Sequence, residues 1–287
     1  MENTQEEKKE KQKETGQGTD RKRSKYLNIG MLRLEKSYIL YICLIGIGVF
    51  LITAGIRDIV SDYREAAAAR DEYDYLYDLF ARSTPGDNQT TVSPTPGTGE
   101  QGNLPPEDPG TTDGFPSLDE LAAMNSDFIG WFSIEGFVEY PVVQTTDNVK
   151  YINTTFMGEK NTAGALFMDY RHTNVWDEKV CIIYGHRTYD GTMFAPLESY
   201  FDATFMRRNS IINITTRNGE VLTYKIFAAK ATDAWDTSYS VALTNTARAH
   251  EVFPNAPENA NYFLILSTCT RSPNPDERTL VFAALVE

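Results

Sequence analysis

The stretch Tyr262-Phe-Leu-Ile-Leu-Ser-Thr-Cys269 is the first guide to the expected fold, because it is a short apolar run of the length of one β-strand and ends at a thiol. Its apolar residues 263–266 predict a half-buried β-strand with Cys269 at its outlet. Seven more β-rich runs lie at residues 130–136, 137–144, 164–171, 179–185, 211–217, 221–231 and 278–286. Eight short runs separated by turn residues predict a β-sandwich or a closed β-barrel rather than a parallel α/β sheet.

A few helices are expected around these strands. Ser117-Leu-Asp-Glu120 has the spacing of a capping box and predicts a short helix that ends near residue 127. Two further helical segments are expected at residues 193–201 and 241–253. The folded domain then covers residues 115–287, and these 173 residues are ample for one hydrophobic core.

One segment has the properties of a membrane span. Residues 38–56, YILYICLIGIGVFLITAGI, contain no charged side chain in 19 positions. A helix of this length rises about 28 Å, close to the thickness of the bilayer's hydrocarbon core. A cleaved signal peptide would have a shorter apolar core and a shorter basic leader. The sequence therefore predicts one transmembrane helix that places the protein in the lipid bilayer of the cell membrane.

The charge on either side of this span predicts its orientation. Residues 1–36 carry ten basic and seven acidic side chains, a net charge of +3, whereas the whole chain carries −13. Basic flanks stay on the cytoplasmic side of a membrane. We therefore expect a cytoplasmic basic tail at residues 1–37 and place the folded domain that follows the span outside the cell.

Two segments connect the span to the folded domain. Residues 57–82 contain neither glycine nor proline and have an alanine-rich centre, which predicts a helix with an apolar stripe suited to packing or to a stalk. Residues 83–114 contain six prolines and six glycines without apolar periodicity. This composition predicts a flexible linker.

The composition excludes several classes of function. With 27 basic and 40 acidic residues in 287, the chain is not expected to bind nucleic acid. Three cysteines cannot form a dense disulfide framework. The absence of Cys-x-x-Cys and His-x-x-x-His pairs argues against a structural zinc site, and there is no Asp-x-Asp-x-Asp-Gly calcium loop. No metal or organic cofactor is implied.

Three chemically useful residues lie at the ends of predicted strands. Cys269 ends one strand, His186 follows another through Tyr184-Gly185, and Arg278 begins the last strand nine positions after Cys269. Such ends can meet at one rim of a barrel. An imidazole can take the proton of a thiol and later protonate a leaving amine, and a guanidinium can stabilise an oxyanion. These residue types suit acyl transfer, although a cysteine at a strand end is more often a small buried hydrophobe.

The other candidate residues have simpler interpretations. Cys181 lies within an apolar strand and is expected in the core, and Cys43 within the span is expected to face lipid or a packing partner. His172 in a predicted loop and His250 in a polar helix are both expected to face solvent. Arg271 is closer to Cys269 in the sequence than Arg278 and is therefore the rival guanidinium.

Several ordered blocks of the sequence resemble class B sortases. They are residues 139–144 (EYPVVQ), 147–153 (DNVKYIN), 164–171 (GALFMDYR), 184–186 (YGH), 190–194 (DGTMF) and 266–269 (LSTC), followed by Arg278. The chain differs from the family at Ile265, where threonine is frequent, and at Arg271, where an acidic residue can occur. The resemblance implies a closed eight-stranded sortase β-barrel with flanking helices.

The resemblance also implies a function for particular residues. Cys269 would attack the threonine carbonyl of a short sorting motif near the C-terminus of a secreted protein, with His186 as general acid and base and Arg278 as the oxyanion stabiliser. The thioacyl enzyme would then pass its acyl group to an amine of a cell-wall peptide, as in a peptidoglycan precursor. Four further positions would line the substrate groove, namely Asn148, Ile152, Tyr184 and Ser267.

Three alternatives follow from the same residues. A pilin-polymerising sortase would use a lysine side chain of another subunit as the amine. An L,D-transpeptidase also uses Cys, His and Arg, but it carries a Ser-His-Gly-Cys block that is missing here, since Ser-Thr precedes Cys269. A non-catalytic, membrane-tethered binding module would use the barrel as a docking surface. The contribution of residues 235–261 to the groove is left open.

Overall fold

The computed structural model describes residues 26–29, 32–82, 118–241, 251–253, 255–270 and 272–286. The chain divides into two compact units, Met1–Ser61 and Asp62–Glu287. The predicted linker at residues 83–114, most of the predicted helix at 241–253, His250 and Arg271 lie outside the described residues.

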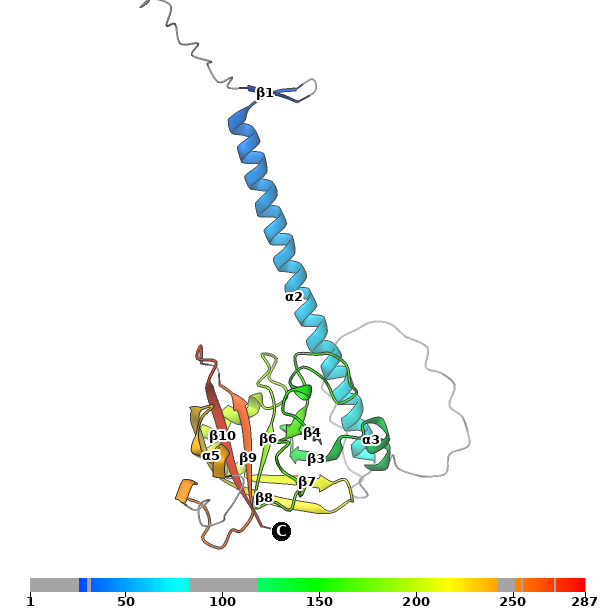
Figure 1. Ribbon diagram of the computed structural model, residues 1–287, viewed down its shortest axis with the longest axis vertical. Coiled ribbons are helices and arrows are strands. Elements are labelled where there is room, and N and C mark those ends of the chain that lie inside the picture. Colours follow the sequence, from blue (N-terminus) through cyan, green and yellow to red (C-terminus); the bar gives the residue numbers. More distant parts are fainter. Residues whose placement is uncertain are drawn as a thin grey trace, which may run out of the picture. The chain divides into compact units, whose positions relative to one another are not determined.

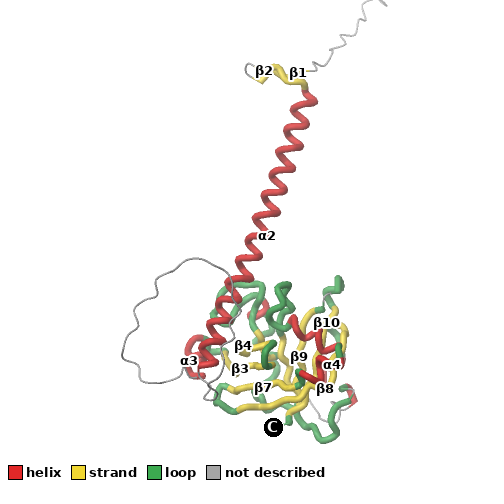
Figure 2. The backbone as a smooth tube through the Cα atoms, turned by 180° about the vertical axis from the view of Figure 1, so that it is seen from behind, coloured by secondary structure: helices red, strands yellow, loops and turns green. Residues whose placement is uncertain are grey.

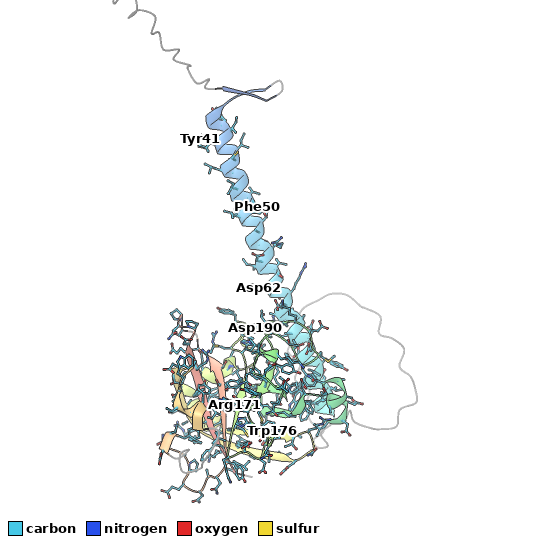
Figure 3. All side chains as sticks on the ribbon, in the orientation of Figure 1. Tyr41, Phe50, Asp62, Arg171, Trp176 and Asp190 are labelled. Carbon is cyan, nitrogen blue, oxygen red and sulfur yellow. The ribbon has the colours of Figure 1, made fainter. Side chains whose placement is uncertain are left out.

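The first unit contains a hairpin and the beginning of a long helix. Strands β1 (Tyr26–Ile29) and β2 (Leu32–Glu35) pair antiparallel, and helix α2 (Lys36–Arg82) follows. Most apolar side chains in the first part of this helix are exposed, with Tyr41 and Phe50 standing out from it (Figure 3). By length and composition, α2 is a candidate membrane span. The predicted helix at residues 57–82 is the second part of α2, because no proline or glycine interrupts the chain between residues 57 and 82.

The second unit is built on a closed barrel of eight strands (Figures 1 and 2). In sequence order the strands are β3 (Phe128–Ile134), β4 (Val138–Val143), β5 (Leu166–Met168), β6 (Val180–Tyr184), β7 (Ile211–Thr216), β8 (Val221–Asp233), β9 (Phe263–Cys269) and β10 (Glu277–Leu285). The spatial order is β10-β8-β7-β3-β4-β5-β6-β9, and β9 pairs with β10 to close the ring. The eight predicted runs correspond to these strands, so the predicted barrel is confirmed.

Short helices lie between the strands. They are α3 (Leu118–Met124), η1 (Lys150–Ile152), η2 (Ala195–Phe201), α4 (Ala203–Arg208) and α5 (Thr237–Val241). Helices α3 and η2 correspond to predicted segments, whereas α4 was not predicted. Its sequence signal is Asp202, whose carboxylate accepts a hydrogen bond of 2.7 Å from the backbone N–H of Phe205 and so caps the helix.

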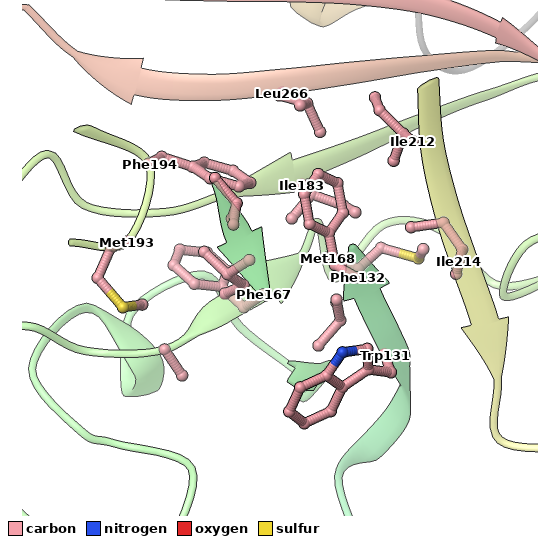
Figure 4. Packing of buried hydrophobic residues seen from close by; sticks show 14 of the residues in the cluster. Trp131, Phe132, Phe167, Met168, Ile183, Met193, Phe194, Ile212, Ile214 and Leu266 are labelled. Carbon is pink, nitrogen blue, oxygen red and sulfur yellow. The ribbon is translucent and has the colours of Figure 1, made fainter. Parts of the chain in front are cut away.

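Strand β9 is buried on both faces, which corrects the prediction of a half-buried strand. Leu264 and Leu266 face the barrel interior, where the latter packs with side chains from other strands (Figure 4). Phe263 and Ile265 belong to a second apolar cluster that also contains Phe253. Apolar side chains from outside the barrel cover this second face, and alternation along the strand therefore distributes apolar residues to two cores.

The part of α2 that belongs to the second unit packs on the barrel. Leu76 is fully buried, and Phe80 stacks on Trp131 with ring centroids 4.3 Å apart and an interplanar angle of 6°. The hydroxyl of Tyr73 donates a hydrogen bond to the carbonyl of Gly164 at 2.5 Å. Of the two uses that the sequence allows for this helix, packing on a neighbour is the one observed from Asp62 onward.

This packing predicts a marked loss of stability in the variant Leu76→Ala. Removing a fully buried leucine side chain costs about 2–5 kcal/mol of unfolding free energy, because transfer energy is lost and a cavity remains. Tyr75→Ala on the exposed side of the same turn is the control. Urea unfolding followed by tryptophan fluorescence measures both variants. Equal losses in the two variants would show that α2 does not contribute to the folded barrel.

Candidate active site

Strand register brings four of the predicted site residues to one face of the barrel. Arg278 lies directly opposite Cys269 in the antiparallel β9–β10 pair, and Tyr184 lies beside Ser267 in the parallel β6–β9 pair. Residues two apart along a strand share a face, so Ser267 and Cys269 point the same way. Partners across neighbouring strands are about 5 Å apart. Residues from three strands therefore form one continuous patch.

The two barrel cysteines occupy opposite environments. Cys269 is the last residue of β9 and is exposed, whereas the preceding Ser267 and Thr268 are buried. Cys181 is fully buried in the barrel, and this burial raises the pKa of its thiol to about 12. Cys181 is a core residue, as predicted, and Cys269 is the thiol of the barrel that a substrate can reach.

His186 is fixed at the end of β6 by main-chain and side-chain contacts. The N–H of Gly185 donates to the carbonyl of Ser267 at 3.2 Å, so the residue before His186 is bonded to the end of β9. The imidazole Nε2 lies 2.7 Å from the carbonyl oxygen of Ile152. Because a carbonyl oxygen only accepts hydrogen bonds, Nε2 is the donor in this contact, and Nδ1 is the nitrogen left to exchange a proton with a substrate or a thiol.

Gly164 provides the space for this imidazole. Its φ of +59° lies in the left-handed region that favours glycine. A Cβ at this position would come within 3.1 Å of His186 Cδ2 and would also crowd the carbonyls of Tyr151 and Ile152. The glycine in the GALFMDYR block therefore has a structural reason, which is the close approach of the His186 ring to the backbone.

The guanidinium of Arg278 is oriented by the turn that precedes β10. Its Nη1 donates to the carbonyl oxygens of Pro275 and Glu277 at 2.6 and 3.0 Å. Among the described residues, none accepts a hydrogen bond from Nε or Nη2 of Arg278. These N–H groups can therefore donate to a bound carbonyl or oxyanion, which is what acyl transfer requires.

A cavity of about 420 Å³ adjoins this patch. Its lining consists of Asn148, Ile152, Phe167, Arg171, Tyr184, Ala234, Tyr239 and Arg278. Three of the four predicted groove residues are among them. The fourth, Ser267, is hydrogen-bonded to Tyr239, which is part of the lining. His186 is not in this lining, but its ring is bonded to Ile152, which is. Three of the predicted substrate residues and the predicted guanidinium thus share one cavity.

Tyr239 in α5 is a site residue that the sequence did not reveal. Its hydroxyl is 2.8 Å from Ser267 Oγ, and its ring stacks with that of Tyr184 at a centroid distance of 6.4 Å. Residues 235–261 were left without an assigned contribution to the groove. The structure places this one tyrosine from that segment over the patch, which no local pattern could indicate.

A charged network holds Tyr184 in the cavity wall. Burial alone would raise the pKa of Asp169, but the Arg171 guanidinium, bonded through Nε and Nη2 at 2.8 and 2.6 Å, outweighs burial and lowers that pKa to about 2. The Tyr184 hydroxyl donates to Asp169 Oδ2 at 2.9 Å. Burial, together with this carboxylate, raises the pKa of Tyr184, so the phenol remains a donor at neutral pH.

The prediction that His172 faces solvent is wrong. Only 2% of this residue is exposed, and its Nε2 accepts a hydrogen bond of 3.1 Å from the N–H of Ile182. Burial lowers the pKa of the imidazole, which favours the neutral ring. His172 is thus a structural histidine that anchors the loop after β5 to strand β6. Within the described ranges, no group of three His, Cys, Asp or Glu residues is placed to hold a metal ion.

The contrast between the two thiols predicts selective alkylation. In a Cys43→Ser chain treated with iodoacetamide under native conditions, the exposed Cys269 is expected to react first, because Cys181 is buried and stays protonated. Peptide mass spectrometry locates the label. Comparable labelling of Cys181 before unfolding would contradict the burial described above.

The low pKa of Asp169 predicts a pH-dependent contribution to stability. A carboxylate whose folded pKa is near 2 stabilises the folded state above its unfolded pKa, and this contribution is lost as pH falls toward 2. The difference in unfolding free energy between the unmodified chain and Asp169→Asn should shrink by about 2 kcal/mol between pH 5 and pH 2. Urea titrations at each pH measure it, and a constant difference would rule out this role.

Comparison with known proteins agrees with this geometry. A family model described as a sortase domain matches residues 133–286. The curated Sortase B of Staphylococcus aureus is 28% identical over 185 residues, which is 60% of this chain and 75% of that protein. The Sortase B of Listeria monocytogenes is 42% identical over 90 residues, and this match spans 31% of this chain and only 37% of that relative.

Solved structures give the same result. Sortase B of Clostridium perfringens aligns with a TM-score of 0.53 and 25% identity, covering 60% of this chain and all of that one. A class B sortase of Streptococcus pyogenes involved in pilus biogenesis aligns with a TM-score of 0.53 and 28% identity, covering 59% of this chain and 97% of that one. With the closed barrel and the matched domain, these relatives establish that the chain belongs to the sortase family and that its relatives are of class B.

Proposed function

We propose that this sortase is a cysteine transpeptidase that cleaves a sorting motif in secreted proteins and transfers the acyl group to an amine of a cell-wall peptide. The observation that carries the proposal is the cross-strand pairing of the exposed Cys269 with Arg278 beside the 420 Å³ cavity. A thiol and a guanidinium that share one face can act on the same carbonyl group.

The first half-reaction forms the acyl-enzyme. Cys269 Sγ attacks the peptide carbonyl carbon, Nδ1 of His186 holds the thiol proton, and the free N–H groups of Arg278 stabilise the oxyanion. His186 then returns the proton to the nitrogen of the scissile bond, and the amine leaves. Asn148, Ile152, Tyr184 and Ser267 would hold the peptide on the acyl side, with Tyr239 covering it.

The second half-reaction transfers the acyl group. A primary amine attacks the thioester carbonyl, its proton passes to His186, and the C–S bond breaks to release Cys269. The helix that can span a membrane supports a membrane-anchored enzyme. The basic residues before it favour a cytoplasmic N-terminus, which would place the barrel outside the cell with secreted substrates.

A pilin-polymerising activity is the second candidate. Its support is the Streptococcus pyogenes relative, a class B sortase involved in pilus biogenesis. The two candidates differ only in the amine, which is the terminus of a cell-wall peptide in one and a lysine side chain in the other. Competition between a peptide amine and Nα-acetyl-lysine amide for one acyl-enzyme would distinguish them.

Substitution of the three proposed catalytic residues gives the main test. The full chain is incubated with a peptide library, and mass spectrometry identifies the acyl-enzyme and the transfer product. Cys269→Ala and His186→Ala should abolish transfer with the barrel still folded. Arg278→Ala should lower turnover by a factor of about 10² or more, as the loss of an oxyanion donor does.

Two matched variants are the controls. Cys181→Ala should keep the acyl-enzyme, since this thiol is in the core, and Arg271→Ala should cost less activity than Arg278→Ala. Loss of activity in Cys181→Ala but not in Cys269→Ala would refute the proposed nucleophile. A larger loss at Arg271 would reverse the roles of the two guanidinium groups. If no peptide forms an acyl-enzyme, the barrel is a binding module and not a transpeptidase.

A further inference from the structure

The part of α2 that begins at Asp62 holds two loops beside His186. The backbone carbonyl of Glu65 accepts from Asn161 Nδ2, and its carboxylate accepts from the N–H of Thr162, both at 2.7 Å. Arg70 Nε lies 3.3 Å from Asp190 Oδ2 in the loop that follows His186. The helix is therefore tied to both sides of the imidazole by its own backbone and side chains.

These contacts enclose a cavity of about 680 Å³ between α2, residues 161–163 and residues 186–192. The size lies within the range of roughly 300–1,000 Å³ that is typical of ligand sites. Asp62 and Asp190, both labelled in Figure 3, belong to its lining. His186 lines this cavity and not the one that contains Arg278. His186 thus belongs to the lining of this cavity, whereas Ile152, to whose carbonyl its ring is bonded, belongs to the lining of the other.

The chemistry of transpeptidation assigns different groups to these two sides. The carbonyl carbon and its oxyanion belong beside Cys269 and Arg278, so the acyl part of the substrate belongs in the 420 Å³ cavity. The attacking amine must give its proton to the general base, and the departing amine must receive one from the same group. Both amines therefore pass on the side of the site that opens to His186.

We infer that the 680 Å³ cavity is the acceptor site, and that α2 supplies one of its walls to bind the peptide that carries the attacking amine. The inference rests on the proposed transpeptidase function. In this step the amine nitrogen forms the new C–N bond, the C–S bond to Cys269 breaks, and the proton passes through His186 to the thiolate.

The charges of the cavity suit an amine. Burial alone would raise the pKa of Asp190, but hydrogen bonds from Thr192 and Thr188 outweigh it and lower this pKa, so Asp190 is a carboxylate at neutral pH. Asp62 adds a second carboxylate to the lining. A primary amine is an ammonium ion in water, and carboxylates at the mouth raise its local concentration. Two guanidinium groups also line the cavity, and each is in an ion pair, Arg70 with Asp190 and Arg187 with Glu198.

Filling the cavity from α2 tests the inference in the full chain. Ala66 lines the cavity, whereas Ala68 lies exposed on the same helix and does not. Ala66→Trp should lower the ratio of amine transfer to hydrolysis at least ten-fold, while Ala68→Trp should stay within two-fold of the unmodified chain. The probes are a peptide found by the library experiment as acyl donor and triglycine as acceptor.

The transfer ratio isolates the acceptor step. One acyl-enzyme divides between triglycine and water, and this partition does not depend on how fast the acyl-enzyme formed. Thr162→Trp fills the cavity from the opposite wall and keeps the hydrogen bond to Glu65, which uses the Thr162 backbone N–H. Thr162→Trp therefore tests the acceptor site even when Ala66→Trp disturbs the packing of α2. It should lower the ratio of transfer to hydrolysis in the same way.

The outcomes separate this inference from the proposed function. An unchanged ratio in Ala66→Trp and Thr162→Trp, with the acyl-enzyme mass still present, would overturn the acceptor site and leave the transpeptidase intact. A ten-fold loss in both filled variants but not in Ala68→Trp would support it. Absence of an acyl-enzyme from the unmodified chain would overturn the proposed function, and this inference with it.

Discussion

The burial of β9 on both faces is the constraint on which the site depends. Leu264 and Leu266 belong to the barrel core, and Phe263 and Ile265 belong to the cluster outside it. A shift of register by one residue would exchange these faces. Because both faces are packed with side chains of particular shape, the strand is fixed between β6 and β10. This register in turn sets Cys269 opposite Arg278 and Ser267 beside Tyr184.

The geometry of the site depends also on the packing of α2 on the barrel. The Tyr73 hydroxyl is bonded to the carbonyl of Gly164, and the backbone of Gly164 leaves room for the His186 ring. Glu65 and Arg70 hold the loops on either side of that ring. A helix that continues from the apolar segment thus contributes to the position of the imidazole.

Different physical signals account for the successes and failures of prediction. The strands could be recognised because each is a short apolar run between turn residues, and such a run can be read from contiguous positions. The beginning of α2 could be recognised for the same reason, since its apolar residues follow one another in the sequence. The predicted exposure of His172 was wrong, because its imidazole is buried and bonded to the backbone of Ile182 in β6, ten positions further along the chain. Helix α4 was missed although its Asp202 cap is visible in the sequence. The domain boundaries and the roles of the catalytic residues remain predictions.

The sequence by itself determined the eight strands, the apolar helix and the residue types able to transfer an acyl group, since these depend on composition and near-neighbour spacing. The tertiary structure alone decided that Tyr239 lines the 420 Å³ cavity and that His186 lines the 680 Å³ cavity. It also decided that α2 packs beside His186, against residues about 90 positions away in the chain. Contacts over such separations depend on how strands and helices pack against one another, and no local pattern of residues records that packing.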